Sequence, residues 1–174
     1  MNNYLYRNDG NTNGWLALKL LGRASNRSAI GAKVRLKAIV AGSTLWQLRE
    51  ISGGSGYCSQ NDMRAHFGLG DATNAEVIRI EWPSGTVQEL SNVAANQILN
   101  IKKPLVLTAL GKNGSGEFQL VMRGGKGLPY TIEYSTNLIH WSHLTNFAAR
   151  NIVSPLSDAG ASSSQRFYRA REDD

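Results

Sequence analysis

The residues best suited to chemistry in this sequence lie within one glycine-rich stretch, Gly53 to Gly70. It holds the only cysteine, Cys58, together with Asp62, Arg64 and His66. A thiol becomes a good nucleophile when a neighbouring base or cation stabilises the thiolate, so these residue types could form the nucleophile, base and orienting acid of a Cys/His hydrolase. Because catalysis also requires a particular spatial arrangement, we favour a second interpretation, in which the stretch is a shaped loop.

The loop interpretation rests on the glycines, which allow positive φ angles and the close approach of other groups. Tyr57 and Phe67 would then anchor the stretch in the core. The side chains of Ser59, Gln60 and Asp62 would hydrogen-bond to the loop backbone. This interpretation makes the stretch an architectural centre that feeds a short strand.

Composition limits the classes of protein to which the chain can belong. Its 174 residues, 41% hydrophobic and 18% charged, suit one large or two small globular domains. No apolar run reaches about 18 residues, so no membrane span is expected, and the first fifteen residues carry no signal-peptide pattern. A single cysteine excludes an internal disulfide framework. The net charge is +6 without any run of five basic residues, which disfavours nucleic acid as a partner.

Two clusters resemble metal sites superficially, and neither predicts one. His140 and His143 flank Trp141, but their neighbours include no acid or thiol to complete a zinc site. The cluster of Asn, Asp and Gly from Asn8 to Asn13 offers oxygen ligands for Ca²⁺, yet it lacks the EF-hand spacing, so a turn is expected. No cofactor is predicted.

Apolar and polar residues alternate with period two along most of the chain, which indicates half-buried strands. The first half has expected strands at Trp15–Leu20, Lys33–Val40, Leu45–Ile51, Glu76–Trp82, Thr86–Leu90 and Asn96–Lys102. The second half has expected strands at Leu105–Leu110, Phe118–Met122, Tyr130–Tyr134, Trp141–Leu144 and Arg166–Arg171. Only Asn92–Gln97 could form a single helical turn. We predict an all-β chain of two β-sandwich-like domains in tandem, residues 1–103 and 104–174, with little or no helix.

The tryptophans and arginines are the remaining candidates for binding. The four tryptophans could stack on sugars, but each lies in a strand pattern with apolar neighbours, so a core position is favoured. Trp46 is the one to test, because it lies beside polar residues in a predicted hairpin. Arg27, Arg64 and Arg79 could present a cationic face, although solvated or ion-paired arginines are more common. The predicted binding residues are Trp46, Arg49, Ser59, Gln60, Asp62, Arg64 and His66.

Four motifs carry a resemblance to a known family. They are SNRSAIGAKVRL at Ser25–Leu36, GYCSQND at Gly56–Asp62, HFGLG at His66–Gly70 and EWPSG at Glu81–Gly85. In this order and spacing they resemble the ASPIC/UnbV domain over about residues 1–103. The resemblance implies extracellular or periplasmic residence and a role in adhesion or matrix interaction, with no catalytic residues to transfer.

The same resemblance implies a partner. Such domains typically follow a β-propeller of FG-GAP or VCBS repeats, and YLYRNDG at Tyr4–Gly10 resembles the tail of a last repeat. This chain would then be a fragment or a natural product without the propeller.

In the second half, YTIEYSTNLIHW at Tyr130–Trp141 and RFYRAR at Arg166–Arg171 are similar to fibronectin-III-like modules of secreted bacterial proteins, which serve as spacers or attachment domains. We therefore expect a non-catalytic extracellular binding or adhesion module that contacts a protein or a glycan through its loops. The alternative is a structural accessory or spacer of a larger secreted propeller protein or enzyme, and a Cys/His hydrolase is the third hypothesis.

Overall fold

The computed structural model of the chain is all-β. It describes residues 4–7, 9–23, 26–54, 56–161 and 165–173, which contain thirteen strands and no helix. The strands are β1 (Gly14–Leu21), β2 (Lys33–Val40), β3 (Ser43–Glu50), β4 (Ala65–Gly70), β5 (Asn74–Glu81), β6 (Val87–Ala94), β7 (Gln97–Lys102), β8 (Val106–Lys112), β9 (Phe118–Arg123), β10 (Pro129–Ser135), β11 (Ser142–Ala148), β12 (Val153–Asp158) and β13 (Phe167–Glu172). The predicted fold class is confirmed.

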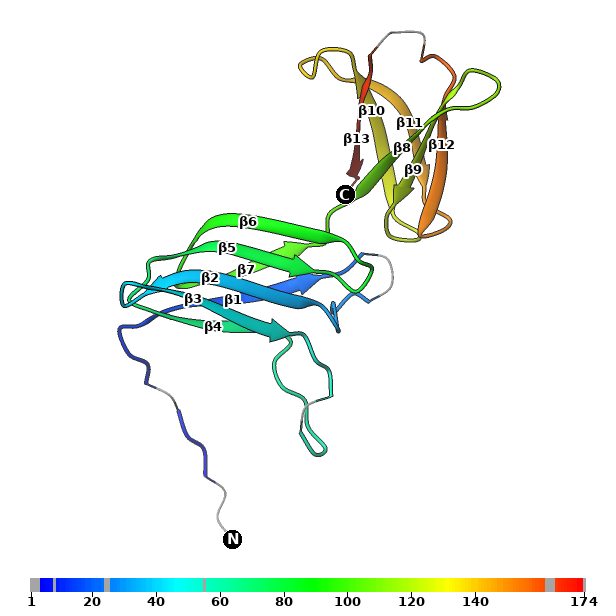
Figure 1. Cartoon of the computed structure of the whole chain (residues 1–174). Helices are drawn as coiled ribbons and strands as arrows, with labels where there is room; N and C mark the ends of the chain where they lie inside the picture. The colour runs from blue at the N-terminus through cyan, green and yellow to red at the C-terminus, as the bar shows by residue number, and fades with distance from the viewer. Residues whose placement is uncertain (1–3, 8, 24–25, 55, 162–164, 174) are drawn as a thin grey trace. The chain divides into compact units, whose positions relative to one another are not determined.

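The strands belong to two compact units, one containing residues 1–20 and 29–101 and the other containing 21–28 and 102–174. The first unit has a four-stranded sheet in the order β3-β2-β5-β6 and a three-stranded sheet in the order β4-β1-β7, which form two layers in Figure 1. The second has the sheets β11-β10-β13 and β12-β9-β8. Each unit has a hydrophobic core of its own.

The core of the first unit lies between its two sheets, as the alternation predicts. The inward residues of three predicted strands are at most 3% exposed, namely Leu16, Leu18, Leu20, Val34, Leu36, Ala38, Ile78, Ile80 and Trp82. Strand β4 adds Phe67 and Leu69, both fully buried. Burying a large apolar side chain contributes about 1.5–3 kcal/mol, so this set supplies the main driving force for the unit.

Two tight turns set the register of the four-stranded sheet. Ala41 and Gly42 join β2 to β3 with φ angles of 48° and 74°, the pair of positive values that a two-residue type I′ hairpin requires. Between β5 and β6, Gly85 has a φ of 83° and donates its N–H to the Trp82 carbonyl at 2.9 Å. Pro83 to Gly85 therefore form a tight turn between the two strands.

Strand β3 directs two polar side chains, and not Trp46, toward the other sheet. Gln47 Nε2 donates to the Gly68 carbonyl of β4 at 2.7 Å, and Arg49 Nε donates to the His66 carbonyl at 3.1 Å. Since successive side chains alternate between faces, these bonds direct Trp46 outward, where it is 54% exposed. The assignment of Trp46 to the core is wrong, because the side of β3 that faces β4 carries Gln47 and Arg49, whose hydrogen bonds cover the edge of β4.

The helical turn considered at 92–97 is also wrong. β6 continues to Ala94, and β7 begins at Gln97. Asn92 and Asn96 have φ angles of 55° and 61°, which asparagine tolerates better than most residues. These two asparagines therefore interrupt or reverse extended chain and do not start a helix.

The second unit contains β12, which has no counterpart among the predicted strands. Pro155 lies in its middle, opposite Val121 of β9, and proline argues against a strand because it has no N–H to donate. The strand order β12-β9-β8 places β12 at an edge, where the missing donor faces away from the neighbouring strand. Tyr130 is fully buried in the core of this unit, and its hydroxyl accepts the Gly125 N–H at 2.6 Å.

Candidate functional site

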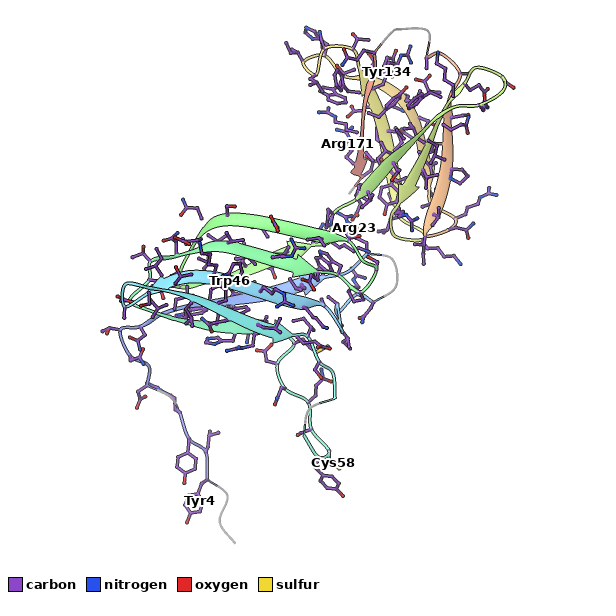
Figure 2. All side chains as sticks on the ribbon, viewed as in Figure 1. Tyr4, Arg23, Trp46, Cys58, Tyr134 and Arg171 are labelled. Atoms are coloured by element: carbon purple, nitrogen blue, oxygen red, sulfur yellow. The ribbon has the colours of Figure 1, made fainter. Side chains whose placement is uncertain are left out.

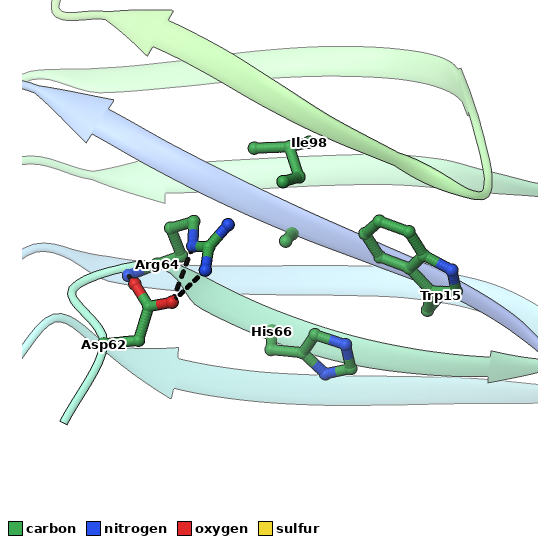
Figure 3. A pocket seen from close by; sticks show the side chains of 6 residues that line it. Trp15, Asp62, Arg64, His66 and Ile98 are labelled. Carbon is green, nitrogen blue, oxygen red and sulfur yellow. Dashed lines mark hydrogen bonds and ion pairs between the residues drawn. The ribbon is translucent and has the colours of Figure 1, made fainter. Parts of the chain in front are cut away.

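A shallow depression of about 330 Å³ lies on the outer face of the sheet β4-β1-β7 (Figure 3). Its lining residues are Trp15, Ala17, Asp62, Arg64, His66 and Ile98. Strand alternation explains the outward direction: Leu16 and Phe67 are fully buried, so Trp15 on β1 and His66 on β4 face outward. Asp62 and Arg64 come from the end of the loop that leads into β4.

Trp15 and His66 form an aromatic pair at the centre of this surface. Their ring centroids are 6.0 Å apart and their planes differ by 10°. In the antiparallel register Trp15 is opposite Gly68, which has no side chain to cover the indole. The glycine thus allows the histidine, two residues away on the same face, to lie beside the tryptophan.

An ion pair borders the aromatic pair. Arg64 Nε donates to Asp62 Oδ2 at 2.7 Å, the second guanidinium nitrogen bonds to the same oxygen, and the Arg64 N–H donates to Asp62 Oδ1 at 2.9 Å. The side-chain hydrogen bond from Arg64, followed by its backbone N–H, holds the pKa of Asp62 below its usual value. Both groups are therefore charged at neutral pH and compensate each other at the rim of the depression.

A second trough of about 350 Å³ continues from the first. It is lined by Gly10, Asn11, Asn13, Gly14, Trp15, His66, Gly68 and Gly70, so the two depressions share the aromatic pair. The Asn13 N–H donates to Asn11 Oδ1 at 2.9 Å, and this Asx turn shapes the border of the trough. Because half of the lining residues are glycines, main-chain polar groups can approach a bound molecule closely.

The structure brings together three of the predicted binding residues, Asp62, Arg64 and His66. Arg49 is directed toward β4 and places its guanidinium carbon 5.4 Å from the centroid of the Phe67 ring. Trp46 lies on the outer face of the other sheet. Ser59 and Gln60 lie in the exposed loop before β4. The role of all seven in binding stays a prediction.

The loop before β4 meets the expectation only in part. Phe67 is fully buried and Asp62 bonds to the backbone, as predicted. Tyr57 is 96% exposed, so its assignment as a core anchor is wrong; the loop projects from the sheet and its tip has no core to enter (Figure 2). Within the described part of the loop, neither Ser59 nor Gln60 makes the predicted side-chain hydrogen bond to the backbone.

Cys58 does not join the depression. It is exposed near the tip of the loop, with a φ of 53°. Among the described residues no hydrogen bond links it to His66, whose ring pairs with that of Trp15 instead. The geometry gives a thiol nucleophile no base, and the hydrolase hypothesis gains no support.

The described residues contain no group of three or more His, Cys, Asp or Glu side chains that could hold a metal ion. A ring nitrogen of His143 lies 2.8 Å from Asn146 Oδ1, and the backbone N–H of His140 donates to Asn137. Asn8, part of the calcium cluster considered from the sequence, lies outside the described residues. No described helix is long and apolar enough to cross a membrane.

Sequence reasoning missed Trp15, Asn11, Asn13, Gly68 and Ile98 as site residues. The sequence did contain a signal for the position of Trp15. Successive side chains of a strand point to opposite faces, so an inward Leu16 places Trp15 on the outer face. The trough had no comparable local signal, since it requires the N-terminal segment and β4 to meet.

Comparison with known proteins supports the identity of the first unit. Residues 22–106 match the family model described as ASPIC and UnbV. Cartilage acidic protein 1 from mouse is 35% identical over 99 residues, which are 56% of this chain and 15% of that protein. The human protein of the same name is 38% identical over 100 residues, which are 56% of this chain and 14% of that protein.

The chain spans at most 15% of the length of the curated relatives named above. No solved structure matches it at a significant level. The family model and the relatives together support an ASPIC/UnbV domain at residues 22–106, a range that includes Asp62, Arg64, His66 and Gly68. The family match begins after Trp15 and ends near the start of β8.

Proposed function

We propose that this protein is a non-catalytic binding or adhesion module that acts outside the cell and contacts a protein or a glycan through the outer face of sheet β4-β1-β7. The observation that carries the proposal is the Trp15–His66 pair in a depression bordered by the Arg64–Asp62 ion pair. Binding sites commonly combine such an apolar surface with a few fixed polar groups that set orientation.

The ASPIC/UnbV match supports a non-catalytic accessory role. The motifs shared with that family add two parts of the proposal, an extracellular or periplasmic location and an association with an FG-GAP or VCBS propeller. The second unit then serves as a fibronectin-III-like spacer or attachment domain. Its two three-stranded sheets with a separate core suit such a role.

A second candidate function is a structural part of a longer secreted protein. The observation that favours it is the N-terminal segment, in which Tyr4, Leu5 and Tyr6 are 77%, 100% and 87% exposed. Three consecutive uncovered large apolar side chains are unusual on a soluble surface, and burial against another domain would remove them from water. If the protein has this structural function, the depression around Trp15 and His66 binds no ligand.

The two candidates are separated by measuring retention of purified polysaccharides and purified extracellular matrix proteins on the immobilised chain. We expect at least one probe to be retained, and Trp15→Ala to weaken its retention by about tenfold, the loss of one well-packed aromatic contact. Ile39→Ala, which removes an exposed apolar side chain from the other sheet, is the control and should change nothing. If no probe is retained, or if Trp15→Ala binds as well as the unaltered chain, the structural candidate replaces the binding one.

A further inference from the structure

We propose that the double depression around Trp15 and His66 binds a chain of uncharged pyranose sugars. This inference rests on the proposed binding function and narrows its ligand to one chemical class. One sugar ring packs on the aromatic pair, and the next ring along the chain occupies the glycine-lined trough.

The aromatic pair provides the packing surface. The face of a pyranose ring presents C–H groups, which are attracted to the negative face of an aromatic ring while the hydroxyl groups remain at the edge. The planes of Trp15 and His66 differ by only 10°, so together they offer a larger surface of one orientation than either ring alone. Ile98, 48% exposed, extends the apolar part of the floor. Figure 3 shows these side chains on the same side of the sheet.

The trough provides hydrogen-bonding groups of both kinds. Hydroxyl groups donate and accept, so they are matched by amide side chains, which carry both donors and acceptors. Asn11 and Asn13 border the trough, and Gly10, Gly14, Gly68 and Gly70 line the rest of it. A Cβ atom added to Gly68 would have no heavy atom within 4 Å, which shows that the space above this residue is open.

The charge of the lining favours a neutral ligand. The charged side chains that line the two depressions are Asp62 and Arg64, and they pair with each other. A nucleic acid or a sulfated polysaccharide would need several unpaired cations along its path, because phosphate or sulfate contacts dominate such binding. An uncharged sugar chain requires no such compensation.

The continuity of the two depressions predicts a dependence on chain length. They meet at Trp15 and His66, so a single sugar ring can fill only one of them. We expect affinity to rise by about tenfold from a monosaccharide to a disaccharide, the gain from one additional packed and hydrogen-bonded ring. Longer chains should bind no better, because the lined surface ends there.

The test is an array of neutral and anionic oligosaccharides, followed by calorimetric titration of the full chain with size-graded oligomers of the best neutral hit. Trp15→Ala should weaken binding by about tenfold. Gly68→Ala should also weaken it, because the methyl group enters the trough. Its backbone φ is not in the left-handed region and its added Cβ meets no atom, so the thermal midpoint should hold or rise. Ile39→Ala on β2 is the control and should bind normally.

The possible results separate the two levels of the proposal. A blank array, binding only to anionic chains, or sugar binding unchanged by both Trp15→Ala and Gly68→Ala would overturn the carbohydrate inference. If the array is blank but a purified matrix protein is retained and Trp15→Ala abolishes its retention, the binding function stands with a protein ligand. If Trp15→Ala affects no probe of either kind, both proposals fail.

Discussion

Asp158 is the polar residue whose loss we expect to damage the second unit most. It ends β12 and is 2% exposed, yet it is a carboxylate. It accepts hydrogen bonds from Arg166 Nη1 at 2.5 Å, from the Tyr168 hydroxyl at 2.9 Å and from the Gly160 N–H at 2.9 Å. The Arg166 guanidinium also lies 4.3 Å from the centroid of the Tyr134 ring. These contacts tie β12 to the segment that leads into β13.

The magnitude follows from what remains buried after substitution. Asp158→Ala leaves Arg166, whose side chain is 12% exposed, without its counter-ion, and breaking a buried pair in this way costs about 3–5 kcal/mol. We expect the lower end, because the Gly160 carbonyl still accepts from the guanidinium. Arg166→Met should cost a similar amount, about 3–5 kcal/mol, because it leaves the Asp158 carboxylate, which is 2% exposed, without its counter-ion. We expect the lower end here too, because Asp158 keeps the hydrogen bonds from Tyr168 and Gly160.

Hydrogen exchange resolved by peptide is the appropriate assay, because a chain with two units has no single free energy of unfolding. The loss of protection should be confined to β8–β13 and leave β1–β7 unchanged. The double variant Asp158→Ala/Arg166→Met should lower the free energy of opening of the second unit by less than the two single variants do together. We expect a difference of at least about 1 kcal/mol, since the two residues are in direct contact. Additive losses, or an Asp158→Ala effect below about 1 kcal/mol, would refute this account of the pair.

Three other predictions concern separate parts of the chain. Burial, followed by the hydrogen bond to Asp158, raises the pKa of Tyr168 from 10.0 to about 12, so an absorbance titration that compares the unaltered chain with Tyr168→Phe should show that the Tyr168 phenolate forms near pH 12. Because the folded pKa is the higher one, its contribution to stability is complete below pH 10 and is lost between pH 10 and about 12; Tyr168→Phe should remove that part of the decline. The double variant Gln47→Ala/Arg49→Ala exposes two carbonyls of β4, and sedimentation should detect self-association through the uncovered edge; a monomer at every concentration would speak against the covering role. Cys58 should react with a thiol reagent no faster than in the denatured chain, and a faster reaction would restore the hydrolase hypothesis.

Local patterns predicted the parts of the fold that depend on neighbouring residues. In β2 and β5 the alternation identified the buried face correctly, because successive side chains of a strand always point to opposite sides. The hairpin that joins β2 to β3 was predicted in the same way, although its turn residues are Ala41 and Gly42 and not the expected Gly42 and Ser43. Strand β12 was not predicted, because proline within a strand is acceptable only at the edge of a sheet and Pro155 therefore argued against a strand. Whether a strand lies at an edge depends on the assembled sheet.

The sequence by itself determined that this protein is all-β and which residues of its central strands are buried, because both depend on a local period of two. Only the tertiary structure decided which strands are neighbours. The meeting of β3 with β4 directs Gln47 and Arg49 toward the edge of β4 and leaves Trp46 in water. The pairing of β1 with β4 lays His66 beside Trp15 and leaves the space above Gly68 open. Residues distant in the chain form the candidate site together, and no local periodicity specifies such a pairing.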